Sequence, residues 1–229
     1  MAGSMTEVPV NGGVVPAYVS LPPAGSGPGV VVIQEWWGLV PHIRNVADRL
    51  AAQGFVAMAP DLYHGQETSE PDEAGKLLME MRLDQAAKDM AATVDALLAM
   101  PETTGDGVGA IGFCAGGGLA LYLASLKPEV TAVVCYYGFP RQGMQWDLSA
   151  VKGAVLGHFA EHDDWANREL ADGMERELRD AGVDVTFHHY PGTTHAFFND
   201  DRPEVYHAEA ADRSWKRTLE FLRDRLGGG

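Results

Sequence analysis

The stretch "GAIGFCAGGGLALYLAS", residues 109–125, decides the fold of this 229-residue chain. An apolar run ends at Cys114, glycines stand on both sides of it, and an alanine- and leucine-rich helical pattern follows. Gly112, Cys114 and Gly116 have the spacing of the nucleophile elbow G-x-S-x-G, with cysteine in place of serine. Glycines at these places relieve crowding around a nucleophile on a strained strand-to-helix turn. The alternative is a buried cysteine that fills a hole in the core.

Strand-like and helix-like patterns alternate along the rest of the chain. Strands are predicted at 13–20, 29–35, 55–63, 107–114, 130–138, 153–164 and 183–192, and helices at 41–54, 70–100, 115–126, 166–182 and 204–226. Pro16 suggests an edge position for the first of these strands. This alternation predicts one α/β domain over 1–229, with a mainly parallel sheet covered by helices on both faces. Residues 1–5 and 227–229 are expected to be flexible ends.

Composition narrows the classes of partner. The net charge of −15 would repel a phosphate backbone, so we expect no nucleic-acid partner. No apolar run is long enough to span a bilayer and no secretory segment is apparent, so we expect a cytoplasmic protein without a membrane partner. Two cysteines do not suggest a disulfide framework, and Cys135 in "TAVVCYYG" is predicted to be a core residue. We expect a monomer or weak homodimer.

No cofactor or metal is expected from the motifs. The glycines after Cys114 lack the order of a phosphate-binding loop, which excludes the usual nucleotide signatures. His158 and His162 stand four residues apart, but they straddle a predicted strand end and do not share a helical face. We therefore predict no metal site.

Two candidate partners for Cys114 follow later strands. Asp163 stands at the end of one strand and His195 in a loop after the next, so both should reach the carboxyl edge of the sheet. The order nucleophile, acid, histidine is that of a hydrolase built on such an elbow. The alternatives are a capping role for Asp163, Asp164 as the acid, and a surface role for His195.

The predicted strand 29–35 ends in a second unusual group. Glu35 follows a run of apolar residues, and a carboxylate there is costly unless it has a partner; the alternative is a helix cap or a surface carboxylate. An oxyanion hole would use the backbone N–H groups of Ala115 and Trp36, although Trp36 is also a candidate for the core. An aromatic pocket for a small planar substrate is predicted from Trp36, Phe113, Trp165 and Phe197.

Several ordered motifs make the chain resemble the dienelactone hydrolase family of the α/β-hydrolase fold. They are "VVIQEWWGL" (31–39), "APDLYHG" (59–65), "GFCAGGG" (112–118), "YYG" (136–138), "HFAEHDD" (158–164), "YPGTTHAFFND" (190–200) and "AADRSWKRTLEFL" (210–222). The resemblance implies a Cys-His-Asp triad, which maps onto Cys114, His195 and Asp163. It also implies a glutamate near the resting thiol, at Glu35, that holds the thiol poorly activated until substrate displaces it.

The chain departs from this family where dienelactone-specific members hold a substrate carboxylate with two arginines. Those places are taken by Asn199, a further candidate substrate contact, and by a position near Pro71. Arg82, Arg141 and Arg202 are possible substitutes, each with a surface role as the alternative.

We therefore expect hydrolysis of a small-molecule ester or lactone through a covalent thioester. The competing hypotheses are a general small-ester carboxylesterase with the same triad, a non-catalytic binding protein of this fold, and a thiol redox role for Cys114.

Overall fold

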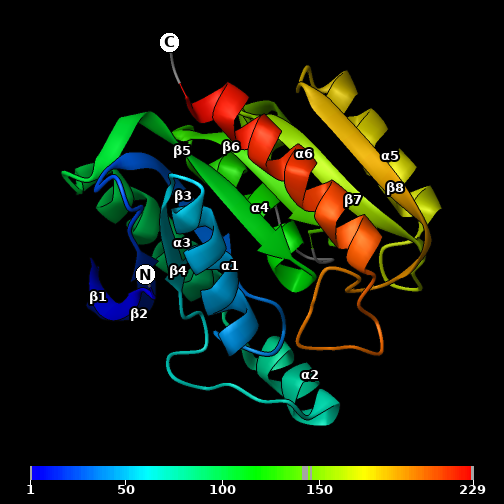
Figure 1. Cartoon of the computed structure of the whole chain (residues 1–229), viewed down its shortest axis with the longest axis horizontal. Helices are drawn as coiled ribbons and strands as arrows, with labels where there is room; N and C mark the ends of the chain where they lie inside the picture. The colour runs from blue at the N-terminus through cyan, green and yellow to red at the C-terminus, as the bar shows by residue number, and fades with distance from the viewer. Residues whose placement is uncertain (1, 141–143, 145, 228–229) are drawn as a thin grey trace.

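The computed structural model describes residues 2–140, 144 and 146–227 (Figure 1). Its strands are β1 (Ser4–Val10), β2 (Gly13–Ser20), β3 (Gly27–Ile33), β4 (Val56–Pro60), β5 (Thr103–Phe113), β6 (Val130–Tyr136), β7 (Ala154–His162) and β8 (Val185–Thr194). Its helices are α1 (Pro41–Ala52), α2 (Pro71–Glu80), α3 (Leu83–Ala99), α4 (Ala115–Leu126), α5 (Arg168–Asp180) and α6 (Ala208–Leu226), with a 3-10 turn at Leu148–Ala150.

All eight strands form one sheet in the order β1-β2-β4-β3-β5-β6-β7-β8. The pairs β1–β2 and β2–β4 are antiparallel, and every later pair is parallel. Helices α1 and α6 lie side by side on one face, where Arg49 of α1 stacks on Trp215 of α6, and α3 and α4 cover the other face (Figure 1). The expected α/β-hydrolase architecture, with a mainly parallel sheet between helices, is confirmed.

The central strands are buried on both faces because helices cover both sides. The four residues from Val30 to Ile33 in β3 have no exposed surface, and neither has Ile111 in β5. This burial explains the continuous β-branched runs of these strands, which lack the polar alternation of a strand with one wet face. Because these strands are parallel, their carboxyl ends meet at one edge of the sheet, where the site residues are found.

The N-terminal segment differs from the prediction. Ser4 and Met5 begin β1 and do not belong to a flexible end, and the Gly3 N–H donates to the Asp48 carboxylate at 2.9 Å. Pro16 does not mark an edge strand, because β1 pairs with β2 along its whole length. The strand was missed because its seven residues include Pro9 and only one fully buried side chain, Val8, so its periodic signal is weak.

The expected helix over 70–100 is two helices. The chain turns at Met81 and Arg82, whose extended backbone ends α2 and begins α3. This break matters for the site, because α2 can then leave the sheet and stand beside the carboxyl ends of the strands (Figure 1).

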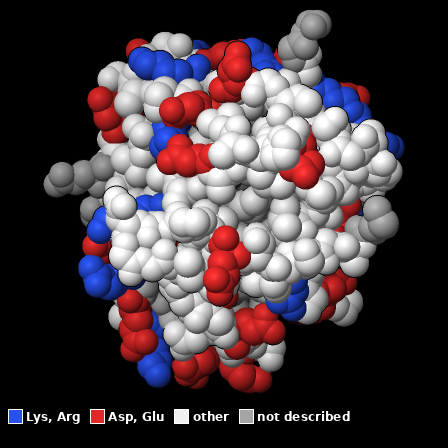
Figure 2. Space-filling model, turned by 90° about the vertical axis from the view of Figure 1, so that its left-hand side faces the viewer, with Lys and Arg blue, Asp and Glu red and all other residues white. Residues whose placement is uncertain are grey.

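The surface is acidic overall but mixed in detail. On the face shown in Figure 2, red carboxylates and blue basic groups alternate around a broad region without charged side chains. Among the residues that the structure describes, no helix has the length and apolar character needed to cross a bilayer.

Candidate active site

Cys114 occupies the turn between β5 and α4, with backbone angles φ 54° and ψ −120°. This is the left-handed region, which is strained for a residue with a side chain. The flanking glycines are required by close backbone contacts: a Cβ on Gly112 would lie 1.9 Å from the Gly116 oxygen, and one on Gly116 would lie 2.4 Å from the Gln34 oxygen. This turn, residues 112–116, is called the elbow below, and it holds the Cys114 thiol partly exposed.

Asp163 and His195 meet beyond the ends of β7 and β8. Asp163 Oδ2 lies 2.8 Å from His195 Nδ1, while Oδ1 accepts the backbone N–H groups of Trp165 and Ala166, each at 2.8 Å. The Asp163 side chain is fully buried, whereas Asp164 is exposed. Asp163 thus closes a local turn with one oxygen and contacts the histidine with the other. It does not cap a helix, because α5 begins at Arg168 and has Asn167 as its N-cap.

The charges of this pair are coupled. Burial disfavours the imidazolium of His195, but the hydrogen bond with Asp163 and the nearby Cys114 sulfur outweigh it and raise its pKa to about 10. Burial likewise opposes ionisation of Asp163, yet the bond to His195 and the two backbone N–H groups leave its pKa lowered. The arrangement therefore stabilises a proton on His195 next to a carboxylate that stays ionised.

A cleft of about 640 Å³ opens above Cys114 and His195. Its walls come from α2, from the segment after β6 and from the start of α5, and most of its lining is apolar. Trp36 and Trp165 both line it, with ring centroids 6.5 Å apart. Within the described part of the chain, the backbone N–H groups of Trp36 and Ala115 donate to no protein acceptor, so both are available to a ligand oxygen.

Glu35 is buried beside this site with one partner. Its side chain is 2 % exposed; Oε2 accepts the Asn199 amide at 2.8 Å, and Oε1 has no hydrogen-bond partner among the described residues. Asn199 is also 2 % exposed and accepts the Asp201 N–H at 3.1 Å. Neither the helix-capping nor the surface alternative for Glu35 holds, because the end of β3 lies beneath the loop that follows His195.

Tyr137 belongs to the site, although the prediction omitted it. Its ring centroid lies 5.0 Å from that of His195, its backbone has φ 38°, and its buried hydroxyl has no hydrogen-bond partner among the described residues. Burial raises the pKa of Tyr137 far above its ordinary value, and the nearby charges of Glu35 and Cys114 add to this. Its place directly after the apolar strand 130–136, within "YYG", is the signal that could have identified it.

The predicted aromatic pocket is partly wrong. Phe113 and Phe197 are fully buried: Phe113 stacks on Tyr136 and Phe198, and Phe197 packs against Tyr190. The pleat of a strand alternates side chains between faces, so Phe113 points into the helix-covered core while the elbow turns Cys114 outward. Asn199, the further candidate substrate contact, donates its amide to Glu35. Of the two adjacent tryptophans, Trp37 lies in the core.

Neither Arg82 nor Arg202 replaces the arginines that the resemblance implied. Arg82 pairs with Asp84 at 2.8 Å, and Arg202 pairs with Glu204 at 2.8 Å and stacks on Trp37. Pro71 begins α2, and Arg141 lies outside the described residues. The described cleft lining therefore contains no basic side chain except His195.

His158 and Cys135 are core residues, whereas His162 lies on the surface. His158 is fully buried between Tyr190 and Thr218, which bond its two ring nitrogens at 2.8 and 3.0 Å, whereas His162 is exposed. No group of three or more potential metal ligands occurs in the described ranges. Cys135 is buried, donates to the Gly138 oxygen, and has its pKa raised to about 12 by burial.

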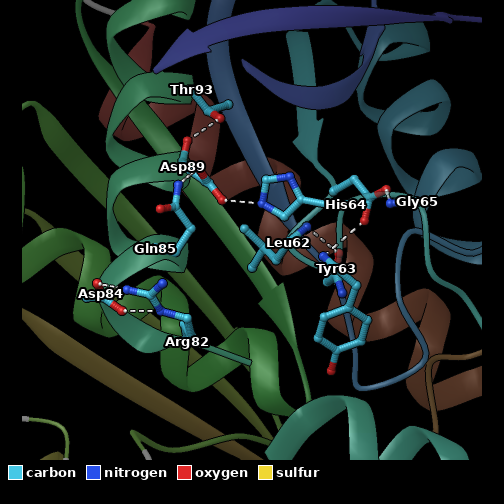
Figure 3. A network of polar contacts seen from close by, with 11 residues as sticks. Leu62, Tyr63, His64, Gly65, Arg82, Asp84, Gln85, Asp89 and Thr93 are labelled. Carbon is cyan, nitrogen blue, oxygen red and sulfur yellow. Dashed lines mark hydrogen bonds and ion pairs between the residues drawn. The ribbon is translucent and has the colours of Figure 1, made fainter. Parts of the chain in front are cut away.

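A polar network fastens the loop after β4 (Figure 3). Asp89, buried on α3, accepts from Gln85 at 2.8 Å and lies 2.9 Å from His64 Nε2, whose backbone has φ 50°. Leu62 of the same loop donates to Gln34 at 3.0 Å. Because Gln34 precedes Glu35, this network supports the chain segment that carries Glu35 and the Trp36 N–H.

Known proteins resemble this chain in sequence and in fold. The sequence model of the "Dienelactone hydrolase family" matches residues 15–226. "Protein usf" of Aquifex pyrophilus is 38% identical over 231 residues, covering 98% of this chain and 99% of the relative. A "Putative carboxymethylenebutenolidase" of Aquifex aeolicus is 37% identical, with coverage of 98% and 99%. The crystal structure of a dienelactone hydrolase-like promiscuous phosphotriesterase from metagenomic libraries superposes with a TM-score of 0.87 at 28% identity, covering 99% of this chain and 100% of that one.

Proposed function

The chain belongs to the dienelactone hydrolase family, and we propose that it hydrolyses a carboxylic ester or lactone through a covalent thioester on Cys114. One observation carries the proposal. Asp163 bonds His195 at 2.8 Å, and His195 lines the same apolar cleft as Cys114, which stands on a strained turn. In this proposal Cys114 is the nucleophile, His195 the general base and acid, and Asp163 the group that orients His195.

In the first half-reaction His195 takes the thiol proton, and the thiolate attacks the carbonyl carbon. A carbon–sulfur bond forms and the carbonyl electrons move to oxygen. When this intermediate collapses, the bond to the alcohol oxygen breaks and His195 returns its proton to that oxygen, leaving the thioester. The raised pKa of His195 supports the step, because it favours the proton on the imidazole while the thiol is ionised.

In the second half-reaction water attacks the thioester. His195 takes a proton from the water, and collapse of the intermediate breaks the carbon–sulfur bond and releases the acid; His195 then returns the proton to the Cys114 thiolate. With a lactone, the alcohol remains tethered to the acyl group, so ring opening is the net result. The N–H groups of Trp36 and Ala115 would hold the oxyanion in both halves, assisted by the positive N-terminal end of α4.

Glu35 is proposed to restrain the thiol before substrate arrives. It is a buried carboxylate with one free oxygen, and its charge and that of Cys114 act on the same Tyr137 hydroxyl. A substrate that displaces this carboxylate would release the thiol for attack. We expect Glu35→Ala to increase the hydrolysis of a simple aryl acetate, and an unchanged or lower rate would contradict this role.

The first test is hydrolysis of a chromogenic aryl acetate with intact-mass detection of the acyl-enzyme. The parent should turn over and gain one acetyl group, Cys114→Ala should do neither, and Cys114→Ser should retain at most a trace of turnover. Cys135→Ala is the matched control, because Cys135 is the other cysteine and is fully buried. Acetylation that persists in Cys114→Ala would refute the assignment, and binding without turnover of any ester would favour a binding protein.

A further inference from the structure

The cleft offers an apolar surface larger than a short acyl group needs. Leu78 and Met79 of α2 line one part of it, Leu170 and Met174 of α5 another, and Phe139 lies between the strand end and these helices. Its volume of about 640 Å³ is within the range of pockets that enclose whole small ligands. An acetyl group would leave most of this surface in contact with water.

The apolar lining continues onto the exposed rim. Met79 is 79 % exposed, Trp165 76 % and Leu170 52 %, and all three line the cleft. Large apolar side chains gathered around a cleft mark contacts with an apolar ligand. The bound group is therefore expected to extend from Cys114 to the mouth of the cleft.

The charged groups around the cleft disfavour an anionic substrate. A second cavity of about 580 Å³ shares Trp165 and His195 with the cleft and contains the carboxylates of Glu161 and Asp164. Among the described residues, neither cavity is lined by lysine or arginine. A substrate carboxylate at this site would lose water without meeting a lysine or arginine of the described lining, and it would face the carboxylates of Glu161 and Asp164, which is costly.

Lys76 and Asn199, a basic and an amide side chain near the cleft, already have partners in the protein. Lys76 lines a separate hollow outside Trp36 and Met79, where it pairs with Glu73 at 3.6 Å. Asn199 donates to Glu35 and accepts from Asp201, so it has little left to offer a substrate.

We propose that the substrate is an uncharged ester or lactone with an extended apolar group, and that this site discriminates against substrates bearing a carboxylate. The inference rests on the proposed hydrolase function and deepens it by naming the substrate class. It separates this chain from family members that hold a substrate carboxylate.

Two 4-nitrophenyl esters test the charge requirement: the hexanoate, and the monoester of adipic acid, which has the same chain length and ends in a carboxylate. We expect kcat/KM to be about 10- to 100-fold higher for the hexanoate. In a series of neutral acyl chains, kcat/KM should rise about two- to fourfold per methylene until the cleft is filled. Equal kcat/KM for the two six-carbon esters would overturn the inference while leaving Cys114-dependent hydrolysis intact.

A cation placed on the wall should reverse the preference. Leu170→Lys should raise kcat/KM for the adipate monoester at least about tenfold relative to the hexanoate, because the ammonium would pair with the carboxylate. Leu126→Lys is the matched control: Leu126 is a similarly exposed leucine, at the far end of α4, that does not line the cleft. A shift of the same size in Leu126→Lys, or none in Leu170→Lys, would contradict the inference.

If neither ester is hydrolysed, that result would count against the proposed function. A measurement of ligand binding would then still test the inferred preference for an uncharged substrate. In Cys114→Ala, ligands in the cleft should quench the fluorescence of Trp36 and Trp165. Methyl hexanoate should quench at lower concentration than the hexanoate anion. Tighter binding of the anion would overturn the inference.

Discussion

Replacing Asp163 by asparagine separates its two structural tasks. The carboxylate accepts three hydrogen bonds, from His195, Trp165 and Ala166, each at 2.8 Å, and its side chain is fully buried. In Asp163→Asn the remaining oxygen can keep the two backbone bonds, so the turn should survive. The amide nitrogen would then face His195 and donate to Nδ1, which moves the imidazole proton to Nε2. A proton at Nε2 prevents His195 from accepting the one on the thiol.

The size of the effect follows from the contacts. The pKa of His195 is raised from 6.5 to about 10 against the effect of burial, with Asp163 as the largest favourable contribution. A hydrogen bond involving a charged group is worth about 1.5–3 kcal/mol, so its loss should lower the pKa of His195 well below that of the parent. Loss of the correct tautomer should lower kcat by about 10³–10⁴, the scale found for the equivalent change in a serine triad.

The assays are the pH dependence of kcat/KM with a chromogenic ester, the His195 titration by NMR, and unfolding in urea. Asp164→Asn is the matched control, because Asp164 is the neighbouring carboxylate and is exposed; its activity should stay within about twofold of the parent. The reasoning is refuted if Asp163→Asn, folded and stable, keeps its rate within about threefold, or if Asp164→Asn loses activity instead.

Three further outcomes are expected. Gly138→Ala would place a Cβ 1.9 Å from the carbonyl oxygen of the elbow cysteine, so urea unfolding should show a loss of about 3 kcal/mol or more, together with lower activity. A double-mutant cycle of Asn199→Ala and Glu35→Ala should give a coupling of about 1.5–3 kcal/mol, because among the described residues the amide is the one partner of that buried carboxylate; a coupling near zero would refute the contact. Because its pKa is raised, protonated His195 contributes to the free energy of unfolding. This contribution is fully present below pH 6.5 and is lost as the pH rises through 10. The parent should therefore lose stability over this range relative to His195→Gln, and parallel curves would show that the pKa is not raised.

The sequence alone was sufficient for the architecture and the elbow. Alternation of β-branched runs with helical patterns predicts a parallel sheet because each crossover helix must cover a face, and that sheet is found. The spacing of Gly112, Cys114 and Gly116 can be read from the sequence because it belongs to one strand-to-helix turn. The need for Gly112 is local, since a Cβ there would clash with the Gly116 oxygen, whereas Gly116 is required by the approach of Gln34 from the end of another strand. Asp163 and His195 were also placed near one another, because strand ends share an edge.

Tertiary packing decided everything that depends on which atoms meet across the fold. Asp163 and Asp164 are adjacent in sequence, and only the turn after β7 buries the first against His195 and exposes the second. Phe113 precedes Cys114 yet lies in the core, because the pleat and the elbow send adjacent side chains to opposite sides. Glu35 and Asn199 are 164 residues apart, and their contact exists only because the end of β3 meets the loop after β8. A sequence pattern shows how buried residues repeat along one helix or strand. The contact partners of a side chain and the shape of a cavity depend instead on several elements that end at the same place.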